Sequence, residues 1–298
     1  MEPVGLAITS IGLDGEETDQ LTALPKPEIR VRKGLVVATA EKTLAKATCT
    51  YESLRDLDID TPLGRIQIVR VTSHGSMLVG GPSTVTDLEV LLEELHAEQI
   101  HQVWIDGAFS RQSSTMLSDG VIYAVGGAYS NDLDLVIDHA KTDIQILSIP
   151  RVEHDQSALA SIHGIAIYRH GVWKERHESS LFEMSSIDTL LTEGIEKIYL
   201  PGALTEEFVK TWLKMPSLTR PKLILSHPTG IIQDRVLRGF LCRYLDDIRV
   251  LHPISLVAIT VNPSSPYRPD FDKEDMLHRL QQISKYPVFN LREEGETS

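Results

Sequence analysis

The chain has 298 residues, enough for one large domain or two ordinary ones, since domains usually contain about 100–200 residues. Its content of 42% hydrophobic and 24% charged residues is typical of a globular protein and excludes a disordered chain. Lys and Arg number 29 against 42 Asp and Glu, and the net charge of −13 repels a nucleic-acid backbone. We therefore expect no nucleic-acid partner.

The cysteine content and the lack of long apolar segments indicate where the protein works. Cys49 and Cys242 are the two cysteines, too few for a disulfide framework, which favours a reducing compartment. The sequence opens with Met1-Glu2-Pro3 and lacks the basic start and apolar stretch of a secretory signal. No segment approaches the ~18 consecutive apolar residues of a membrane span. We predict a cytoplasmic protein with no membrane partner.

In the first half of the chain, short apolar and β-branched runs bounded by Gly, Pro or Asp predict strands. These runs are Val4–Thr9, Leu35–Ala38, Ile66–Val71, Met77–Val79, Val103–Ile105 and Val121–Val125. The clearest helix covers about Thr84–Glu98, where four leucines at helical spacing form one apolar stripe. A second helix is expected over about Asn131–Lys141, and Thr61–Gly81 is interpreted as a local hairpin-like insertion.

The pattern changes near residue 150, and a second series of elements follows. Ile165–Arg169 and Val172–Glu175 flank His170-Gly171 and predict a β-hairpin. Strands and helices then alternate, with strands at Ile195–Leu200, Lys222–Ser226, Ser255–Val261 and Pro287–Leu291, and helices at Thr205–Lys214, Gln233–Tyr244 and Lys273–Ser284. This alternation favours an α/β fold with a mostly parallel sheet covered by helices. We predict two α/β units, 1–150 and 151–298, with a single large sheet as the alternative.

Polar side chains follow the first predicted strand where it ends. They are the hydroxyls of Thr9 and Ser10 and the carboxylates of Asp14 and Glu16. Ligands of open α/β sheets gather at the carboxyl ends of strands, and Mg²⁺ prefers carboxylates together with phosphates. The sequence predicts a site for nucleotide phosphate and Mg²⁺ here. An ordinary turn at Asp14-Gly15 is the alternative.

Two further segments are candidates for the same site. A strand ends in Asp106, where phosphate-handling α/β proteins hold a metal or its water, and Arg111 follows with a guanidinium suited to an anion. Gly81 and Ser83 precede the clearest helix, whose N-terminal amides attract phosphate. The structural alternatives are a strand-Asp-Gly turn and a plain helix cap at Ser83 or Thr84.

Three polar loops follow strands of the C-terminal unit. They are Tyr199–Thr205, Ser226–Gly230 and Thr260–Tyr267. If their strands end at one edge, Thr205, Asn262 and Ser264 form a binding rim. Turns directed by proline are the alternative for each loop.

The sequence contains no complete nucleotide-binding loop. The pattern G-x-x-x-x-G-K-[ST] requires glycines before the lysine, and Lys42-Thr43, Lys141-Thr142 and Lys210-Thr211 all lack them. The patterns G-x-S-x-G, H-E-x-x-H and C-x-x-C are also absent. We assign no catalytic residue, and whether the chain is an enzyme stays open.

Six segments carry a resemblance that covers nearly the whole chain. They are Thr9–Glu17, Thr61–Gly64, Gly80–Ser83, Ile105–Ala108, Pro201–Thr205 and Ile259–Tyr267. Together they resemble a bacterial family found with adenosylcobalamin-dependent amino-acid aminomutases, the reactivase subunit of lysine 5,6-aminomutase. The first and last segments are the most specific parts of the likeness.

The resemblance implies an N-terminal unit similar to P-loop and Mur-ligase-like NTPases. In that family a P-loop precedes the segment matching Val4–Glu17, so we expect the loop to lie upstream of Met1 or to be lost. Leu13 stands where the family pattern has a basic residue.

The function that the resemblance implies is an oligomeric accessory subunit that binds rather than catalyses. It would help an ATPase partner reactivate an aminomutase, with a nucleotide and Mg²⁺ as its expected ligands. One alternative is an NTP-dependent ligase or kinase-like enzyme whose phosphate loop is missing from this chain. Another is a metabolite-binding protein without a partner.

Overall fold

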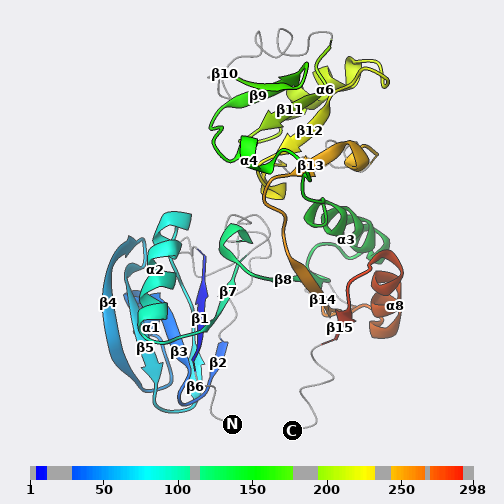
Figure 1. Ribbon diagram of the computed structural model, residues 1–298. Coiled ribbons are helices and arrows are strands. Elements are labelled where there is room, and N and C mark those ends of the chain that lie inside the picture. Colours follow the sequence, from blue (N-terminus) through cyan, green and yellow to red (C-terminus); the bar gives the residue numbers. More distant parts are fainter. Residues whose placement is uncertain are drawn as a thin grey trace. The chain divides into compact units, whose positions relative to one another are not determined.

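The computed structural model describes residues 5–11, 29–107, 115–176, 194–231, 243–265 and 269–290. The chain divides into two compact units, Met1–Leu117 and Ser118–Ser298 (Figure 1). Each unit has its own hydrophobic clusters. Residue 150, where the sequence pattern changes, lies inside the second unit. We call these units 1 and 2 and describe each by itself.

Unit 1 is built on a five-stranded sheet with the order β4-β5-β3-β1-β7. Its strands are β1 (Leu6–Ser10), β3 (Val36–Ala40), β4 (Tyr51–Thr61), β5 (Gly64–Val71) and β7 (Gln102–Asp106). β1 pairs in parallel with β3 and β7, whereas β5 is antiparallel to both β3 and β4. The parallel strands β1, β3 and β7 therefore end at the same edge of the sheet.

Both faces of this sheet carry apolar side chains. Neighbouring residues of a strand point to opposite faces, and consecutive residues of β3 are apolar. Val36 belongs to the cluster that contains the buried leucines of α2 (Val85–Ala97). The next residue, Val37, belongs to a cluster with Met77 of the two-stranded antiparallel ribbon. That ribbon consists of β2 (Ile29–Val31) and β6 (Gly75–Met77), and the short helix α1 (Glu41–Leu44) follows β3.

Unit 2 contains a second five-stranded sheet with the order β10-β9-β11-β12-β13. Its strands are β9 (Ile165–Arg169), β10 (Val172–Arg176), β11 (Lys197–Leu200), β12 (Lys222–Leu225) and β13 (Ile248–Val250). The predicted hairpin is confirmed: His170 and Gly171 have φ of 52° and 80°, as a two-residue turn with positive φ at both positions requires. The remaining elements of this part are α4 (Gln156–Leu159), α6 (Glu206–Lys214), η2 (Pro228–Gly230) and η3 (Leu245–Asp247).

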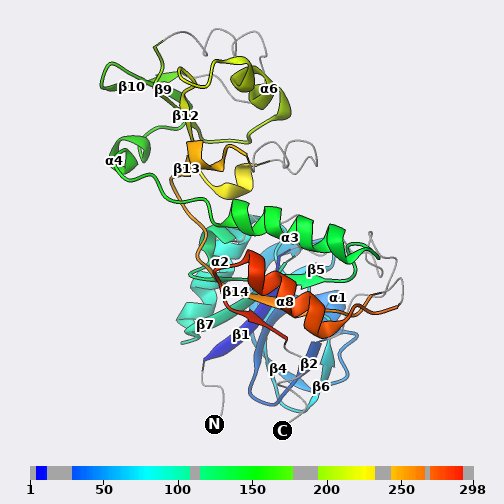
Figure 2. The ribbon, with the colours of Figure 1, turned by 90° about the vertical axis from the view of Figure 1, so that its right-hand side faces the viewer.

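A three-stranded parallel sheet, with the order β15-β14-β8, completes unit 2. Its strands are β8 (Val121–Gly126), β14 (Leu256–Asn262) and β15 (Val288–Phe289). The helices α3 (Leu133–Leu147) and α8 (Lys273–Ile283) contact each other; α3 also contacts β8 and α8 contacts β15 (Figure 2).

The predicted helices that fall within the described residues are confirmed, and each begins where a side chain caps it. Thr84, Asp132, Thr205 and Asp272 each accept a hydrogen bond from a backbone N–H of the first turn. The helix predicted at Gln233–Tyr244 lies largely outside the described residues. None of the helices in the part of the chain that the structure describes is long and apolar enough to cross a membrane.

The prediction of a mostly parallel sheet covered by helices is wrong. Both five-stranded sheets are mixed, and the ribbon of β2 and β6 is antiparallel. The main difference from the prediction is β4, a strand that is absent from the predicted elements. Its Leu57 and Ile59 are buried while the intervening Asp58 is exposed, the two-residue period of a strand with one solvated face. A tight turn joins β4 to β5, which yields an antiparallel pair without a crossover helix.

Candidate functional site

The carboxyl edge of β1, β3 and β7 brings several predicted site residues together. Ser10 pairs with Asp106 in the register of β1 and β7, and the Ile11 amide donates to the Asp106 carbonyl (2.9 Å). The segment after β6 lies across this edge, where the Gly81 amide donates to Ser10 Oγ at 2.9 Å. Ser10, Gly81 and Asp106 are thus neighbours, as the sequence indicated.

The hydroxyl groups of this edge are engaged by the chain itself. Thr9 Oγ1 donates to the carbonyl of Ala38 at 3.0 Å, and Ser10 Oγ donates to the carbonyl of Val79 at 3.2 Å. Thr9 and Ser10 are only 1% and 5% exposed. Since Ser10 Oγ also accepts from Gly81, neither hydroxyl nor the Gly81 amide is available to a phosphate.

Gly81 is required by a close approach between two backbone segments. A Cβ at this position would lie 1.8 Å from the Ser10 carbonyl oxygen and 2.7 Å from Thr9 Oγ1. A backbone carbonyl held in a sheet cannot rotate away as a flexible side chain can. The glycine therefore serves packing of this edge, a different reason from the phosphate contact that the sequence suggested.

A residue that sequence reasoning missed completes the network. Thr39 Oγ1 accepts from the Gly80 amide at 2.8 Å and lies 2.7 Å from Thr43 Oγ1, which donates to the Ala40 carbonyl at 2.5 Å. Thr39 is fully buried within an otherwise apolar strand. A hydroxyl in an otherwise apolar, buried strand must find a partner, and a threonine in such a strand is the sequence signal that could have indicated this residue.

The N-terminus of α2 already carries an anionic group. Ser83 is exposed, and Thr84 is the cap: its Oγ1 accepts from the Asp87 amide at 3.1 Å and donates to Asp87 Oδ2 at 2.7 Å. The Asp87 carboxylate therefore provides the negative charge that a helix N-terminus favours. With Ser10 and Gly81 engaged as well, the described residues of this edge do not form a cradle for phosphate.

Of the three predicted metal ligands, the structure describes Asp106, which is exposed at the end of β7. Asp14, Glu16 and Arg111 lie outside the described residues. Within the described ranges, no group of three or more His, Cys, Asp or Glu side chains is placed to hold a metal ion.

The rim residues predicted for the C-terminal unit lie at the ends of strands from two different sheets. Thr205 follows β11 of the five-stranded sheet and caps α6, accepting from the Phe208 amide at 3.3 Å. Asn262 ends β14 of the three-stranded sheet, and its Oδ1 accepts from the Ser264 amide at 3.3 Å. Asn262 and Ser264 form a local turn, while Thr205 belongs to a separate structure.

A buried histidine lies at the carboxyl end of β12. His227 is 4% exposed, and its Nδ1 lies 2.8 Å from Thr229 Oγ1 and accepts from the Thr229 amide at 3.3 Å. Burial, with a smaller contribution from the nearby His252, lowers the pKa of His227 to about 4. The imidazole is therefore neutral at neutral pH, and it offers hydrogen bonds rather than charge.

The loops after β11 and β12 approach each other closely. A Cβ on Gly230 would lie 2.9 Å from the Gly202 carbonyl oxygen, and the Leu204 amide donates to the Gly230 carbonyl at 2.6 Å. Burial raises the pKa of Tyr199, an effect opposed by its hydrogen bond with Ser226. This edge, like that of unit 1, is stabilised by contacts within the chain.

Comparison with known proteins gives no match for the chain. No family model matches its sequence. No curated protein and no solved structure is significantly similar to it. The functional argument therefore depends on the geometry of the described residues.

Replacing Ser10 with alanine tests whether its hydroxyl is structural. The Ser10→Ala variant leaves the buried Gly81 amide without its acceptor, so we expect a loss of about 1–3 kcal/mol of unfolding free energy. Urea unfolding of the chain measures it. The exposed Ser83→Ala change is the control and should stay within about 0.5 kcal/mol of the wild type. Equal stability of the two variants would contradict the structural role.

The buried histidine predicts how stability depends on pH. The unfolded chain protonates His227 near pH 6.5 and the folded chain only near pH 4, so the unfolded state binds more protons between these values. Stability should therefore fall as the pH is lowered through this window. The fall should be shallower in His227→Gln and unchanged in His163→Gln, an exposed control. Urea titrations at several pH values measure this, and equal slopes for all three proteins would refute it.

Proposed function

We propose that this chain is a cytoplasmic accessory subunit that binds protein partners and helps an ATPase reactivate an adenosylcobalamin-dependent aminomutase. The class of partner comes from the resemblance carried by segments such as Thr9–Glu17 and Ile259–Tyr267. The binding role rests on one observation, an apolar sheet face in unit 2. We call it the open face.

The open face follows from the register of the three-stranded sheet. Ile122 pairs with Ala258, while Thr260 pairs with both Ala124 and Phe289. Directly paired residues point to the same side of a sheet. These five side chains therefore share one face, and none of them is charged.

The two sides of this sheet differ in their burial. Val125, Ile259 and Val261 point to the side that carries α3 and α8, and all three are buried. On the open face Ile122 is 45% and Phe289 41% exposed. Parallel sheets are usually covered on both faces, and an exposed apolar patch on a folded protein typically marks an interaction surface.

A binding role also agrees with the candidate sites described above. The hydroxyls of Thr9 and Ser10 and the amide of Gly81 hold the edge of unit 1 together. The buried His227 is neutral at neutral pH. These groups stabilise the fold and are not available to a phosphate ligand, which agrees with a role in binding rather than catalysis.

Charged substitutions on the open face test this proposal. The double variant Ile122→Asp/Phe289→Asp places two carboxylates in an interface from which water should be excluded. Because burying unpaired charges is costly, we expect affinity for the aminomutase or its ATPase to fall about tenfold or more. Leu218→Asp is the matched control, because Leu218 is 98% exposed and lies elsewhere. Binding is measured by surface plasmon resonance and folding by circular dichroism. The proposal fails if the wild type binds neither partner at micromolar concentration, or if the double variant binds as the control does.

The exposed carboxylate of Asp106 favours a second candidate, an NTP-dependent enzyme. It lies at the end of β7 beside Ser10, at the edge where ligands of parallel strands gather. Under the accessory role, the chain binds without turnover, so a phosphate-release assay should detect no hydrolysis of ATP or GTP by the chain alone. Mg²⁺-dependent hydrolysis that is lost in Asp106→Asn would support the enzyme instead.

A further inference from the structure

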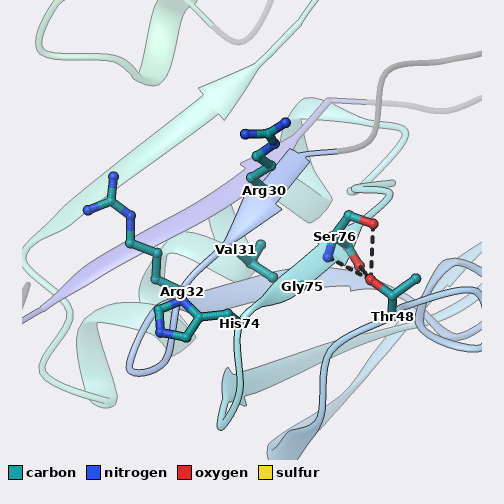
Figure 3. A pocket seen from close by; sticks show the side chains of 7 residues that line it. All are labelled: Arg30, Val31, Arg32, Thr48, His74, Gly75 and Ser76. Atoms are coloured by element: carbon teal, nitrogen blue, oxygen red, sulfur yellow. Dashed lines mark hydrogen bonds between the residues drawn. The ribbon is translucent and has the colours of Figure 1, made fainter. Parts of the chain in front are cut away.

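The β2–β6 ribbon presents two arginines on its outer side. Its register pairs Arg30 with Ser76 and Val31 with Gly75. Val31 is 2% exposed and packs into the apolar cluster beneath the ribbon. Because side chains alternate along a strand, Arg30 points away from that cluster, and Arg32 follows two residues later. Figure 3 shows both guanidinium groups extending from this segment.

These arginines border a cavity of about 690 Å³. Its lining residues are Arg30, Val31, Arg32, Thr48, His74, Gly75 and Ser76 (Figure 3). None of them is acidic, and their guanidinium, imidazole and hydroxyl groups can donate hydrogen bonds. In a chain with a net charge of −13, this is a local concentration of positive charge.

The described arginines of unit 1 divide into two groups. Arg55, Arg65 and Arg70 each form ion pairs with carboxylates, at 2.9 Å to Glu98, 3.0 Å to Asp58 and 3.4 Å to Glu52 respectively. Arg30 and Arg32 form no ion pair and no side-chain hydrogen bond within the described part of unit 1. Their fork-shaped donors thus remain available to a ligand.

The wall of the cavity is held by close backbone packing. A Cβ on Gly75 would lie 2.7 Å from the Cys49 backbone nitrogen and 2.8 Å from its Cβ. The Ser76 amide donates to Thr48 Oγ1 at 2.8 Å, and the Thr48 amide donates to the Ser76 carbonyl at 3.0 Å. The segment around Cys49 is thereby fixed against β6, which holds this wall of the cavity in place.

We propose that this cavity binds a small diphosphate through Arg30 and Arg32. Arginine forks match phosphate oxygens in pairs of parallel hydrogen bonds. Arg30 lies in β2 and Arg32 follows the end of that strand, and both border the same cavity. A diphosphate offers one phosphoryl group to each of the two guanidinium forks, whereas orthophosphate offers one group to both. The imidazole of His74 supplies a further donor on the wall. This inference does not depend on the proposed partner.

Isothermal titration of the full chain with pyrophosphate tests the site. We expect measurable binding, with orthophosphate about fivefold weaker or more because it engages one fork at a time. The Arg30→Gln/Arg32→Gln variant should lose about tenfold or more in affinity, since several charge-assisted hydrogen bonds disappear. Arg65→Gln, which removes an arginine already paired with Asp58, is the matched control and should bind as the wild type does.

Titration with ADP distinguishes two sources of the same chemistry. Equal affinity for ADP and pyrophosphate identifies the diphosphate alone as the ligand, and tighter binding of ADP identifies a nucleoside diphosphate. Both results support the site if the double variant abolishes the binding. The inference is overturned if pyrophosphate does not bind at millimolar concentration, if orthophosphate binds equally well, or if the double variant binds unchanged while circular dichroism shows it folded.

Discussion

The contact between Gly81 and the end of β1 is the constraint on which unit 1 depends. It brings the segment after β6 against Ser10 so closely that no side chain fits at Gly81. The same segment is fixed to β3 through the hydroxyl of Thr39. The segment after β6 is thereby joined to β1 and β3, although these elements lie far apart in the sequence. At this edge, buried hydroxyl groups take the place of water as hydrogen-bond partners of the backbone.

This constraint changes the functional meaning of the polar residues. In the sequence, a serine and a glycine after strands resemble ligands for phosphate. In the structure, the Gly81 amide donates to the Ser10 hydroxyl, while Arg30 and Arg32, which belong to no predicted site, lack partners in the described part of unit 1. Whether a hydrogen-bond donor is already engaged within the chain, more than its residue type, decides whether it stabilises the fold or can bind a ligand. A similar contrast holds in unit 2, where His227 is buried and hydrogen-bonded while Ile122 and Phe289 of the open face are partly exposed.

The two proposed surfaces use different physical forces. The open face around Ile122 and Phe289 offers apolar area, which favours a large partner that can exclude water. The cavity beside Arg30 and Arg32 offers charge in a small volume, which favours a compact anion. A net charge of −13 opposes the approach of extended polyanions. An accessory protein that contacts a partner on one surface and a small ligand on another is consistent with both.

The sequence by itself determined the local elements and their ends. Apolar periodicity and capping residues such as Thr84 and Asp272 located helices, and His170-Gly171 identified its hairpin, because these signals act within a few residues. It could not determine strand order. Buried and exposed residues alternate along the acid-rich β4, but this pattern identifies a strand only once its partner β5 is known. Thr205 and Asn262 follow or end strands of two separate sheets. Only the tertiary structure decided which donors are engaged and which are not, because that depends on contacts between residues distant in the chain, and local sequence does not encode them.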